Sequence, residues 1–469
     1  MLQTVRKAWG VPELRHKILV VLFILLLYRI GAVLPVPFVD SATFASVFES
    51  QYSSTIFSYM STLSGGAMEQ MSLFALGISP YITASIVLQL LTVAFPKLGE
   101  RAKQGEEGKA FINKWTRIVT IILAVVTAIG YYILLAREGA LAPDALYTAK
   151  NGGLWFFYAS VIVVAFCAGA ALVMWLAEKI NENGLGNGIS LILFFNIISS
   201  LPSTLKSLIN IIVDCFTNAE LSAWNGIGAI GFALLVVLVL LAMTFFVIFV
   251  TGSERRIPVQ YAKRVVGRKM YGGQSTNLPL QLNMSGVMPV IFASSIVSLP
   301  TTILVLCNVD GSKKTFWDWL YNAFDPNGWV YPVLLFILII AFAYFYITIS
   351  FNPIEVANNL KKNGGMIPGI RQGRPTAEYI ARILSKITLM GALFLSVVAL
   401  VPILARPLVL EPLLKVILGS GAQGYYATSL ASSFTFGGTS LLIVVGIALE
   451  TARELEAQLT MRNYKGFLS

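Results

Sequence analysis

Charged residues are scarce in this sequence. Of its 469 residues, 12% are Asp, Glu, Lys or Arg and 56% are hydrophobic, and the mean hydropathy is +0.75. An ordinary soluble domain carries about 25% charged residues, so this composition excludes a typical soluble enzyme or binding domain. We therefore predict an integral membrane protein.

Histidine, cysteine and aspartate are also rare, which excludes several kinds of enzyme. The single histidine, His16, lies in the N-terminal tail, and every aspartate falls outside the predicted spans, so serine–histidine and aspartyl intramembrane proteases are excluded. Cys167, Cys215 and Cys307 show neither a disulfide framework nor metal-ligand spacing. GEEGK at 105–109 lacks the first glycine and the final Ser or Thr of a phosphate loop. We expect no catalytic residue, no metal and no cofactor.

Long apolar runs are abundant instead. A membrane helix needs about 20 apolar residues to cross about 30 Å of hydrocarbon. Ten stretches satisfy this requirement, at residues 18–35, 73–95, 116–136, 154–177, 187–205, 226–250, 285–307, 330–351, 383–404 and 434–452. The first continues into VLPVP without a small-residue cleavage site and is followed by nine more, so we expect it to stay in the mature chain. The predicted fold class is an all-α membrane protein with ten transmembrane helices.

Lys and Arg concentrate in the N-terminal tail, in the loops after spans 2, 6 and 8, and in the C-terminal tail. Basic residues of short loops stay on the cytoplasmic side of a membrane, so we predict that both termini are cytoplasmic. This distribution, with contact to anionic lipid headgroups, accounts for most of the net charge of +11. Nucleic-acid binding is not required to explain it.

Ten spans with both ends on one side divide into two halves of five, and the second half must then run through the membrane in the opposite direction. A sequence repeat supports this inverted arrangement. GISPYI at 77–82 opens span 2 and GVMPVI at 286–291 opens span 7, each the second span of its half. Proline is tolerated in the first turn of a helix, so we expect both helices to begin inside the protein, beside a central cavity.

The outer segment at 36–72 contains no Lys or Arg and ends in FSYMSTLSGGAMEQ, at 57–70. Gly65 and Gly66 break this stretch. Irregular backbone at membrane depth must be buried in protein or line a wet cavity. We therefore expect the segment to fold back into the cavity.

Six motifs in the same order on the same spans resemble those of the SecY family, the channel subunits of the bacterial protein translocase. They are ALGISPYITASIVLQLL (75–91), NGLGNGIS (183–190), RRIPVQYAKR (255–264), LPLQLNMSGVMPVIFASSI (278–296), IPGIRQGRPT (367–376) and FGGTSLLIVV (436–445). The resemblance covers essentially the whole chain. It implies a protein-conducting channel for unfolded secretory polypeptides in the bacterial cytoplasmic membrane.

The resemblance also implies an architecture, in which two inverted five-helix halves form a clamshell around a central pore. A short plug helix before span 2, at about 57–70, closes the pore from outside. The expected divisions are an N-terminal half at 1–205, an outer hinge segment at 206–225, a C-terminal half at 226–452, cytoplasmic docking loops at about 251–284 and 352–379, and a cytoplasmic tail at 453–469.

A ring of aliphatic side chains is expected at the pore constriction. The positions that match the family's ring are Ile78, Ile82, Ile189, Leu193, Ile291 and Ile443. Ile78 and Ile82 are four residues apart and share a helix face, as do Ile189 and Leu193. By itself such spacing is more typical of packing than of a pore, and only the motifs favour the pore. An apolar ring can dewet and block ions, and it yields to any side chain that passes.

Small and polar residues on spans 2 and 7 are expected to form a lateral gate that admits signal sequences and releases membrane segments into lipid. They are Thr83, Ser85, Gln89, Ser294, Ser295 and Ser298. Hydrogen bonds of this kind between membrane helices average only about 0.6 kcal/mol, so the contact can open. The alternative is that these residues hold the bundle shut.

Basic residues in the two docking loops are expected to bind the translocation machinery. They are Arg255, Arg256, Lys263, Arg264, Arg371 and Arg374. The resemblance implies the SecA motor ATPase or the ribosome as partners, with SecE and SecG as accessory subunits, and it links Arg371 most closely to driving transport. Ribosomal RNA phosphates attract Arg and Lys. Membrane anchoring by basic residues is the alternative, although it explains the loop lengths poorly.

A secondary transporter is the main competing hypothesis, because a five-plus-five inverted repeat with broken helices is also a transporter architecture. Ion-coupled transporters usually keep ionisable groups near the midplane of the membrane. This chain has almost none. Arg29, late in span 1, can extend outward, and Glu178 and Glu450 lie at inner ends. A structural scaffold is a third hypothesis, but it does not explain the paired proline motifs.

Overall fold

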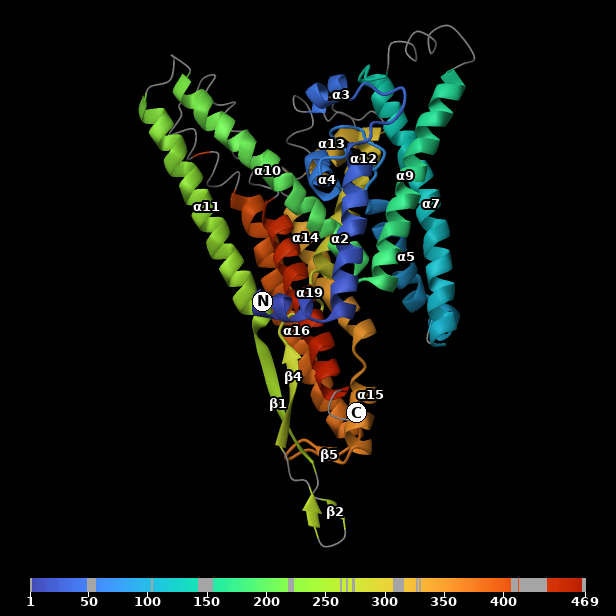
Figure 1. Cartoon of the computed structure of the whole chain (residues 1–469), viewed down its shortest axis with the longest axis vertical. Helices are drawn as coiled ribbons and strands as arrows, with labels where there is room; N and C mark the ends of the chain where they lie inside the picture. Colours follow the sequence, from blue (N-terminus) through green and yellow to red (C-terminus); the bar gives the residue numbers. More distant parts are fainter. Residues whose placement is uncertain are drawn as a thin grey trace.

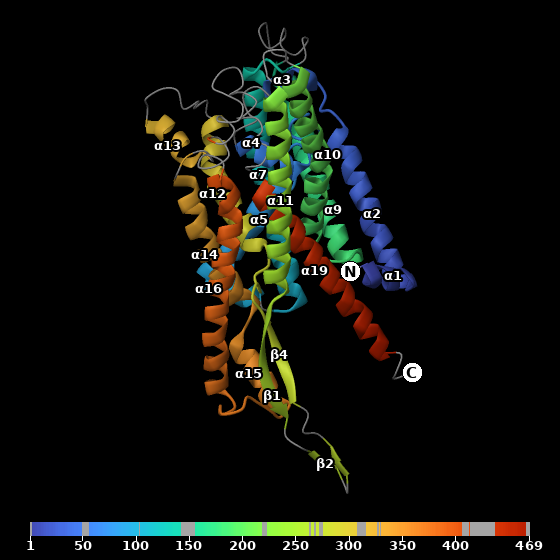
Figure 2. The same ribbon diagram turned by 90° about the vertical axis from the view of Figure 1, so that its left-hand side faces the viewer.

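The computed structural model describes residues 2–48, 56–102, 104–141, 155–217, 223–261, 264–266, 269–271, 275–306, 316–325, 328, 330–405, 412 and 437–465. Long helices run roughly along the longest axis of the molecule, and β-strands project from one end (Figure 1). Figure 2 shows that both termini lie toward that end of the bundle.

Ten helices overlap the ten predicted spans. They are α2 (Pro12–Val33), α5 (Ser79–Ala94), α7 (Glu106–Arg137), α9 (Trp155–Asn183), α10 (Gly188–Thr217), α11 (Ala223–Gly252), α12 (Met288–Leu306), α14 (Val330–Ser350), α16 (Arg374–Ala405) and α19 (Gly437–Lys465). The shorter helices are α1 (Leu2–Trp9), α3 (Ser41–Val47), α4 (Ile56–Ser64), α6 (Pro96–Ala102), α13 (Phe316–Phe324) and α15 (Pro353–Lys362).

Five helical segments of the described chain are long and apolar enough to cross a membrane, namely α2, α7, α9, α16 and α14 with its continuation through α15. The pair α5 and α6, bent by 111°, makes a sixth. The apolar parts of α10, α11 and α12 are shorter. The chain is therefore a multi-pass membrane protein, and the count of ten spans stays a prediction.

The two proline motifs form the same turn at the start of α5 and of α12. Gly77 and Gly286 have φ values of 56° and 63°, a left-handed conformation that glycine adopts without strain. In each copy the amide of the last motif isoleucine donates to the carbonyl four residues earlier. Ile82 donates to Ile78 at 3.1 Å, and Ile291 donates to Val287 at 3.3 Å. The predicted equivalence of GISPYI and GVMPVI is thus confirmed at the level of the turn.

A second pair of glycines repeats between the halves. A Cβ on Gly169 in α9 would overlap the carbonyl oxygen of Leu73, and a Cβ on Gly391 in α16 would overlap that of Leu282. Leu73 and Leu282 each lie four residues before the glycine that opens the motif. In both halves, therefore, the fourth span packs its backbone directly on the chain that leads into the second span. This relation supports the inverted repeat.

The predicted all-α class is wrong for the first docking loop, at 251–284, which forms β-strands. Strand β1 (Glu254–Tyr261) pairs antiparallel with β4 (Ser275–Gln281) and with β5 (Gly365–Met366), in the order β4-β1-β5. A second hairpin joins β2 (Arg264–Val266) to β3 (Lys269–Tyr271).

The three-stranded sheet has its own small core. Ile257 and Val259 alternate along β1 and are both 2% exposed, as expected for a strand with one buried face. They pack with Ile380, Ile383 and Ile387 of α16. Because β5 belongs to the second predicted docking loop, this sheet joins the two loops into one unit.

Helix α10 contains Pro202 and continues to Thr217, and α11 begins at Ala223. The described part of the expected hinge segment at 206–225, namely residues 206–217 and 223–225, is therefore helical. Large apolar side chains face outward from α11, among them Phe245, which is 72% exposed, and Phe249, which is 68% exposed. Exposed apolar area of this extent is typical of a lipid-facing surface.

Candidate functional site

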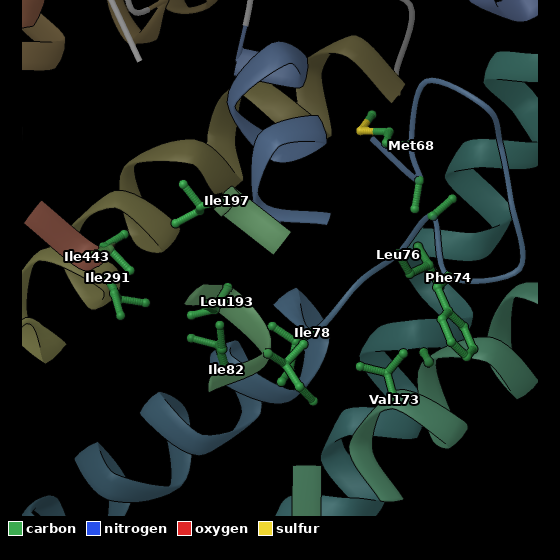
Figure 3. Close-up of a cluster of buried hydrophobic side chains, with 14 of the residues drawn as sticks. Met68, Phe74, Leu76, Ile78, Ile82, Val173, Leu193, Ile197, Ile291 and Ile443 are labelled. Atoms are coloured by element: carbon green, nitrogen blue, oxygen red, sulfur yellow. The ribbon is translucent and has the colours of Figure 1, made fainter. Parts of the chain in front are cut away.

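Aliphatic side chains from four helical elements gather near the middle of the bundle. We call Ile78, Ile82, Leu193, Ile291 and Ile443 the apolar collar. Figure 3 shows these five side chains grouped between α5, α10, α12 and α19. Leu193 and Ile443 are 0% exposed, Ile78 is 2% exposed, and Ile82 and Ile291 are 4% exposed. All five belong to one buried cluster, so the side chains predicted for the ring are brought together.

The sixth predicted ring residue, Ile189, is only partly buried, although it packs against the same cluster. Sequence reasoning missed Ile197, which is 2% exposed and lies in the same close-up (Figure 3). The signal for Ile197 was present, because it continues the four-residue spacing of Ile189 and Leu193 along α10.

The collar residues meet because of where the helices begin. Helices α5 and α12 start at Ser79 and Met288, inside the bundle, and their first turns carry Ile82 and Ile291. Pro80 stands at the first positions of α5, where a missing amide hydrogen costs little.

The predicted plug segment contains α4 and a closed turn that follows it. The Ser61 hydroxyl donates to the Glu69 carboxylate at 2.9 Å, and the Gly66 amide donates to the Ser61 carbonyl at 2.9 Å. Phe57 is 1% exposed and Met68 is 0% exposed. The described side chains of the segment are therefore buried or half-buried up to Met68, whereas Glu69 and Gln70 are exposed.

Three polar side chains from α2 and α10 hold the end of α4. Asn196 donates through Nδ2 to the Leu63 carbonyl at 2.7 Å and to the Tyr28 hydroxyl at 2.9 Å. Arg29 donates through Nη1 to the Gly65 carbonyl at 2.9 Å. We call Tyr28, Arg29 and Asn196 the α4 latch.

Arg29 does not take the outward direction that its position in the sequence allows. Its guanidinium turns inward because the carbonyls at the end of α4 offer acceptors within the bundle, and a cation at membrane depth is stabilised by such partners. Tyr28 and Asn196 were missed by sequence reasoning. A buried asparagine in an apolar helix was the available signal, since buried polar groups require hydrogen-bond partners.

Three of the six residues predicted for the gate line a cavity between α4, α5, α7 and α12. The cavity measures about 160 Å³, and Thr83, Ser295 and Ser298 are among its lining residues. Met60 and Leu63 of α4 also line it. The facing side chains of α5 and α12 thus share one small, mostly apolar space with the predicted plug.

The serine hydroxyls of α12 form their hydrogen bonds along their own helix. Ser295 donates to the Ile291 carbonyl at 2.7 Å, and Ser298 donates to the Ser295 carbonyl at 2.9 Å. Ser294 is buried and also donates to the Ile291 carbonyl. On α5, Gln89 donates to the Ser85 hydroxyl at 3.2 Å. Separation of α5 from α12 leaves these bonds intact.

The predicted docking residues are exposed where the structure describes their side chains. Arg255 and Arg256 lie on β1, and Arg256 pairs with Glu254 at 2.7 Å. Arg371 is exposed, and Arg374 at the start of α16 pairs with Glu378 at 3.1 Å. Lys263 lies outside the described residues, and of Arg264 only the backbone, in β2, is described.

Two carboxyl groups outside the predicted spans form hydrogen bonds with neighbouring residues that lower their pKa. The Thr43 hydroxyl donates to Asp40 at 2.6 Å, and this bond with the Thr43 and Ala42 amides lowers the pKa of the Asp40 carboxyl. A hydrogen bond from Lys179 lowers the pKa of Glu182. The described part of the chain contains no group of three His, Cys, Asp or Glu side chains placed to hold a metal ion.

Comparison with known proteins identifies the family. The sequence model of the SecY family matches residues 72–452. The chain belongs to the SecY family. Protein translocase subunit SecY of Streptomyces scabiei is 44% identical over 473 residues, covering 100% of both chains. The SecY subunit of Corynebacterium glutamicum is 39% identical and covers 98% of this chain and 99% of its own. The resemblance inferred from six motifs is thereby confirmed.

Solved structures share the fold. A structure described as that of a protein conducting channel matches with a TM-score of 0.57 at 19% identity, covering 94% of this chain and 92% of that chain. A SecY structure described through its plug domain matches with a TM-score of 0.61 at 18% identity and the same coverage. The SecY family match contains the collar, gate and docking residues. Helix α4 and Arg29 lie before it, within the part covered by the full-length relatives.

Proposed function

We propose that this chain is the channel subunit through which unfolded secretory polypeptides cross the bacterial cytoplasmic membrane. The observation that carries the proposal is the apolar collar, in which Ile82 and Ile291 from two inverted helix starts lie in one buried cluster with Leu193 and Ile443. A constriction of branched apolar side chains excludes water and ions when empty. It offers few specific contacts, so it accommodates many sequences.

The proposal also includes the arrangement of the spans, the plug and the lateral gate. Ten spans form a two-halved clamshell, residues at about 57–70 act as the plug, and α5 and α12 form the lateral gate. The burial of Phe57 and Met68 supports the plug, and the shared cavity beside Thr83 and Ser295 supports the gate. A membrane segment leaves sideways into lipid when α5 and α12 separate.

The proposed partners bind at the cytoplasmic end, where both termini also lie. The sheet β4-β1-β5 and the exposed Arg371 form the docking unit for SecA or the ribosome, and SecE and SecG complete the complex. Two channels of the same fold are described as ribosome complexes, Sec61 of the canine endoplasmic reticulum and the yeast Ssh1 complex bound to the 80S ribosome. Their TM-scores are 0.55 and 0.53.

Reconstitution tests the function directly. Vesicles that contain this chain with SecE and SecG are mixed with SecA, ATP and an unfolded secretory precursor, and the precursor that becomes protected from protease is measured. We expect ATP-dependent protection, and vesicles without the chain serve as the control. Absence of protection together with concentrative uptake of a small solute would instead support a secondary transporter.

A further inference from the structure

Helix α13 is a short helix, FWDWLYNAF, between α12 and α14 in the chain. It contacts both of these helices. Figure 2 places it beside the end of α12 that lies farthest from the β-strands. By the predicted orientation this is the outer end of the bundle.

One face of α13 is fixed to the protein. Tyr321 and Phe324 pack against the main core, and Asp318 is only 5% exposed. The Thr301 hydroxyl of α12 donates to the Phe324 carbonyl at 3.1 Å. The position of α13 is therefore tied to the proposed gate helix α12.

The first turn of α13 carries three exposed aromatic rings. Phe316, Trp317 and Trp319 are 65%, 55% and 64% exposed. The Phe316 ring stacks on that of Trp319 with centroids 6.1 Å apart, and its centroid lies 5.8 Å from that of Trp317. The helix thus buries the Asp318 carboxylate and leaves three of its aromatic rings exposed, the reverse of the pattern for a helix on a water-facing surface.

We propose that Phe316, Trp317 and Trp319 form an interfacial anchor that inserts into the headgroup–acyl boundary of the outer lipid leaflet, directly beside α12. Tryptophan is enriched at this boundary because its ring is apolar and its N–H is polar.

The surroundings of α13 indicate that lipid covers its exposed aromatic rings. Helix α13 contacts α12 and α14, and both helices expose apolar side chains, among them Ile303 at 56% and Val333 at 50%. The exposed rings of α13 thus accompany the lipid-facing surface of two apolar helices. A second aromatic group, Trp155 with Phe156, is exposed at the start of α9, at the same end of the bundle (Figure 1). Two such groups at one end are typical of an aromatic belt.

Tryptophan fluorescence tests the proposal. In a variant that keeps only Trp319, with the other tryptophans replaced by Phe, emission is compared in vesicles of normal lipid and of lipid brominated near the headgroup. We expect emission to fall about twofold in the brominated lipid, because bromine quenches on contact with an interfacial ring, and iodide in the water to quench weakly. A variant that keeps only Trp175, which is 50% exposed on α9, is the control that must respond to brominated lipid.

Two results overturn the proposal. Strong iodide quenching of Trp319 without bromine quenching places the ring in water, and resistance to both quenchers in vesicles that hold one chain each places it under protein. If the single-tryptophan variants do not fold, the otherwise native W317F/W319F variant replaces them. In this variant the fraction of tryptophan emission that brominated lipid quenches should be smaller than in the wild type. An equal fraction in the two proteins also rejects the anchor.

Discussion

The guanidinium of Arg29 donates a hydrogen bond to the carbonyl oxygen of Gly65 at 2.9 Å. The two residues are 36 positions apart, and the bond joins α2 to the turn after α4. It holds the proposed plug from within the N-terminal half. Since the bond is charge-assisted, it is worth about 1.5–3 kcal/mol, enough to bias a plug between closed and displaced positions.

Loss of this bond should make the resting channel leak. We expect Arg29→Leu to raise the fraction of unplugged channels about ten- to a hundredfold, since each step of about 1.4 kcal/mol corresponds to a factor of ten. Conductance of single channels in planar bilayers is the measurement. Arg117→Leu is the matched control, because Arg117 pairs with Glu178 between α7 and α9 and not with α4. Equal conductance of R29L and wild type would show that the bond does not hold the plug.

Deletion of about residues 57–70 should also make the resting channel conduct small ions, because it removes the turn after α4 and nearly all of α4, which packs against α10 and α12. Planar-bilayer conductance again reports the effect. Adding Arg29→Leu to the deletion should increase the leak no further, because Gly65 is then absent. A deletion variant that stays sealed would mean that this segment is not the plug.

A charge in the collar should hydrate it. We expect Ile82→Asp or Ile291→Asp to increase ion flux through vesicles, since a charge abolishes the dewetted barrier. Ile82→Leu, which keeps the ring apolar, should remain sealed and is the control. Cysteines at 82 and 291 should both crosslink to a stalled polypeptide. A cysteine in place of Leu234, which is 65% exposed on α11, should not. Crosslinking only at position 234 would reject the pore assignment.

Reversal of the charge at Arg371 should slow SecA-driven transport strongly. Arg371→Glu should still fold and insert, because exposed charges contribute little to stability. Rates of precursor protection and thermal unfolding midpoints separate the two effects. Arg382→Glu, at another exposed position on α16, is the control and should keep the wild-type rate. A wild-type rate for R371E would remove Arg371 from the docking unit.

Because Gly169 and Gly391 occupy equivalent positions in the two halves, substitution of either by alanine should lower the stability of the protein to a similar extent. Gly169→Ala and Gly391→Ala each force a methyl group against a backbone carbonyl, and we expect each to destabilise the protein by about 1–3 kcal/mol. Thermal unfolding in detergent measures the loss. A Cβ on Gly231 of α11 meets nothing within 4 Å, so Gly231→Ala should change the stability little. If only one member of the pair is sensitive, the proposed equivalence of the fourth spans is wrong.

Much of the fold could be predicted because its signals are local. An apolar run of sufficient length forms a helix wherever it lies in lipid, since each backbone group bonds within the helix. The turns at Gly77 and Gly286 were predictable for the same reason, because proline and glycine act on their own backbone. The strands β1 and β5 were not predicted. They pair across about a hundred residues, and the partner of a strand is chosen by the folded neighbourhood and not by its own sequence.

The sequence by itself therefore determined the membrane class, the helix starts and the aliphatic residues four apart that became available for a collar. Only the tertiary structure decided which of these residues meet. Ile197 joined the buried cluster, and Ile189 remained at its edge. Arg29 had both the outer boundary and the interior within reach, and the packing of α4 placed the Gly65 carbonyl where the guanidinium bonds to it. A long side chain takes whichever partner the fold supplies, so its direction is a property of the assembled helices.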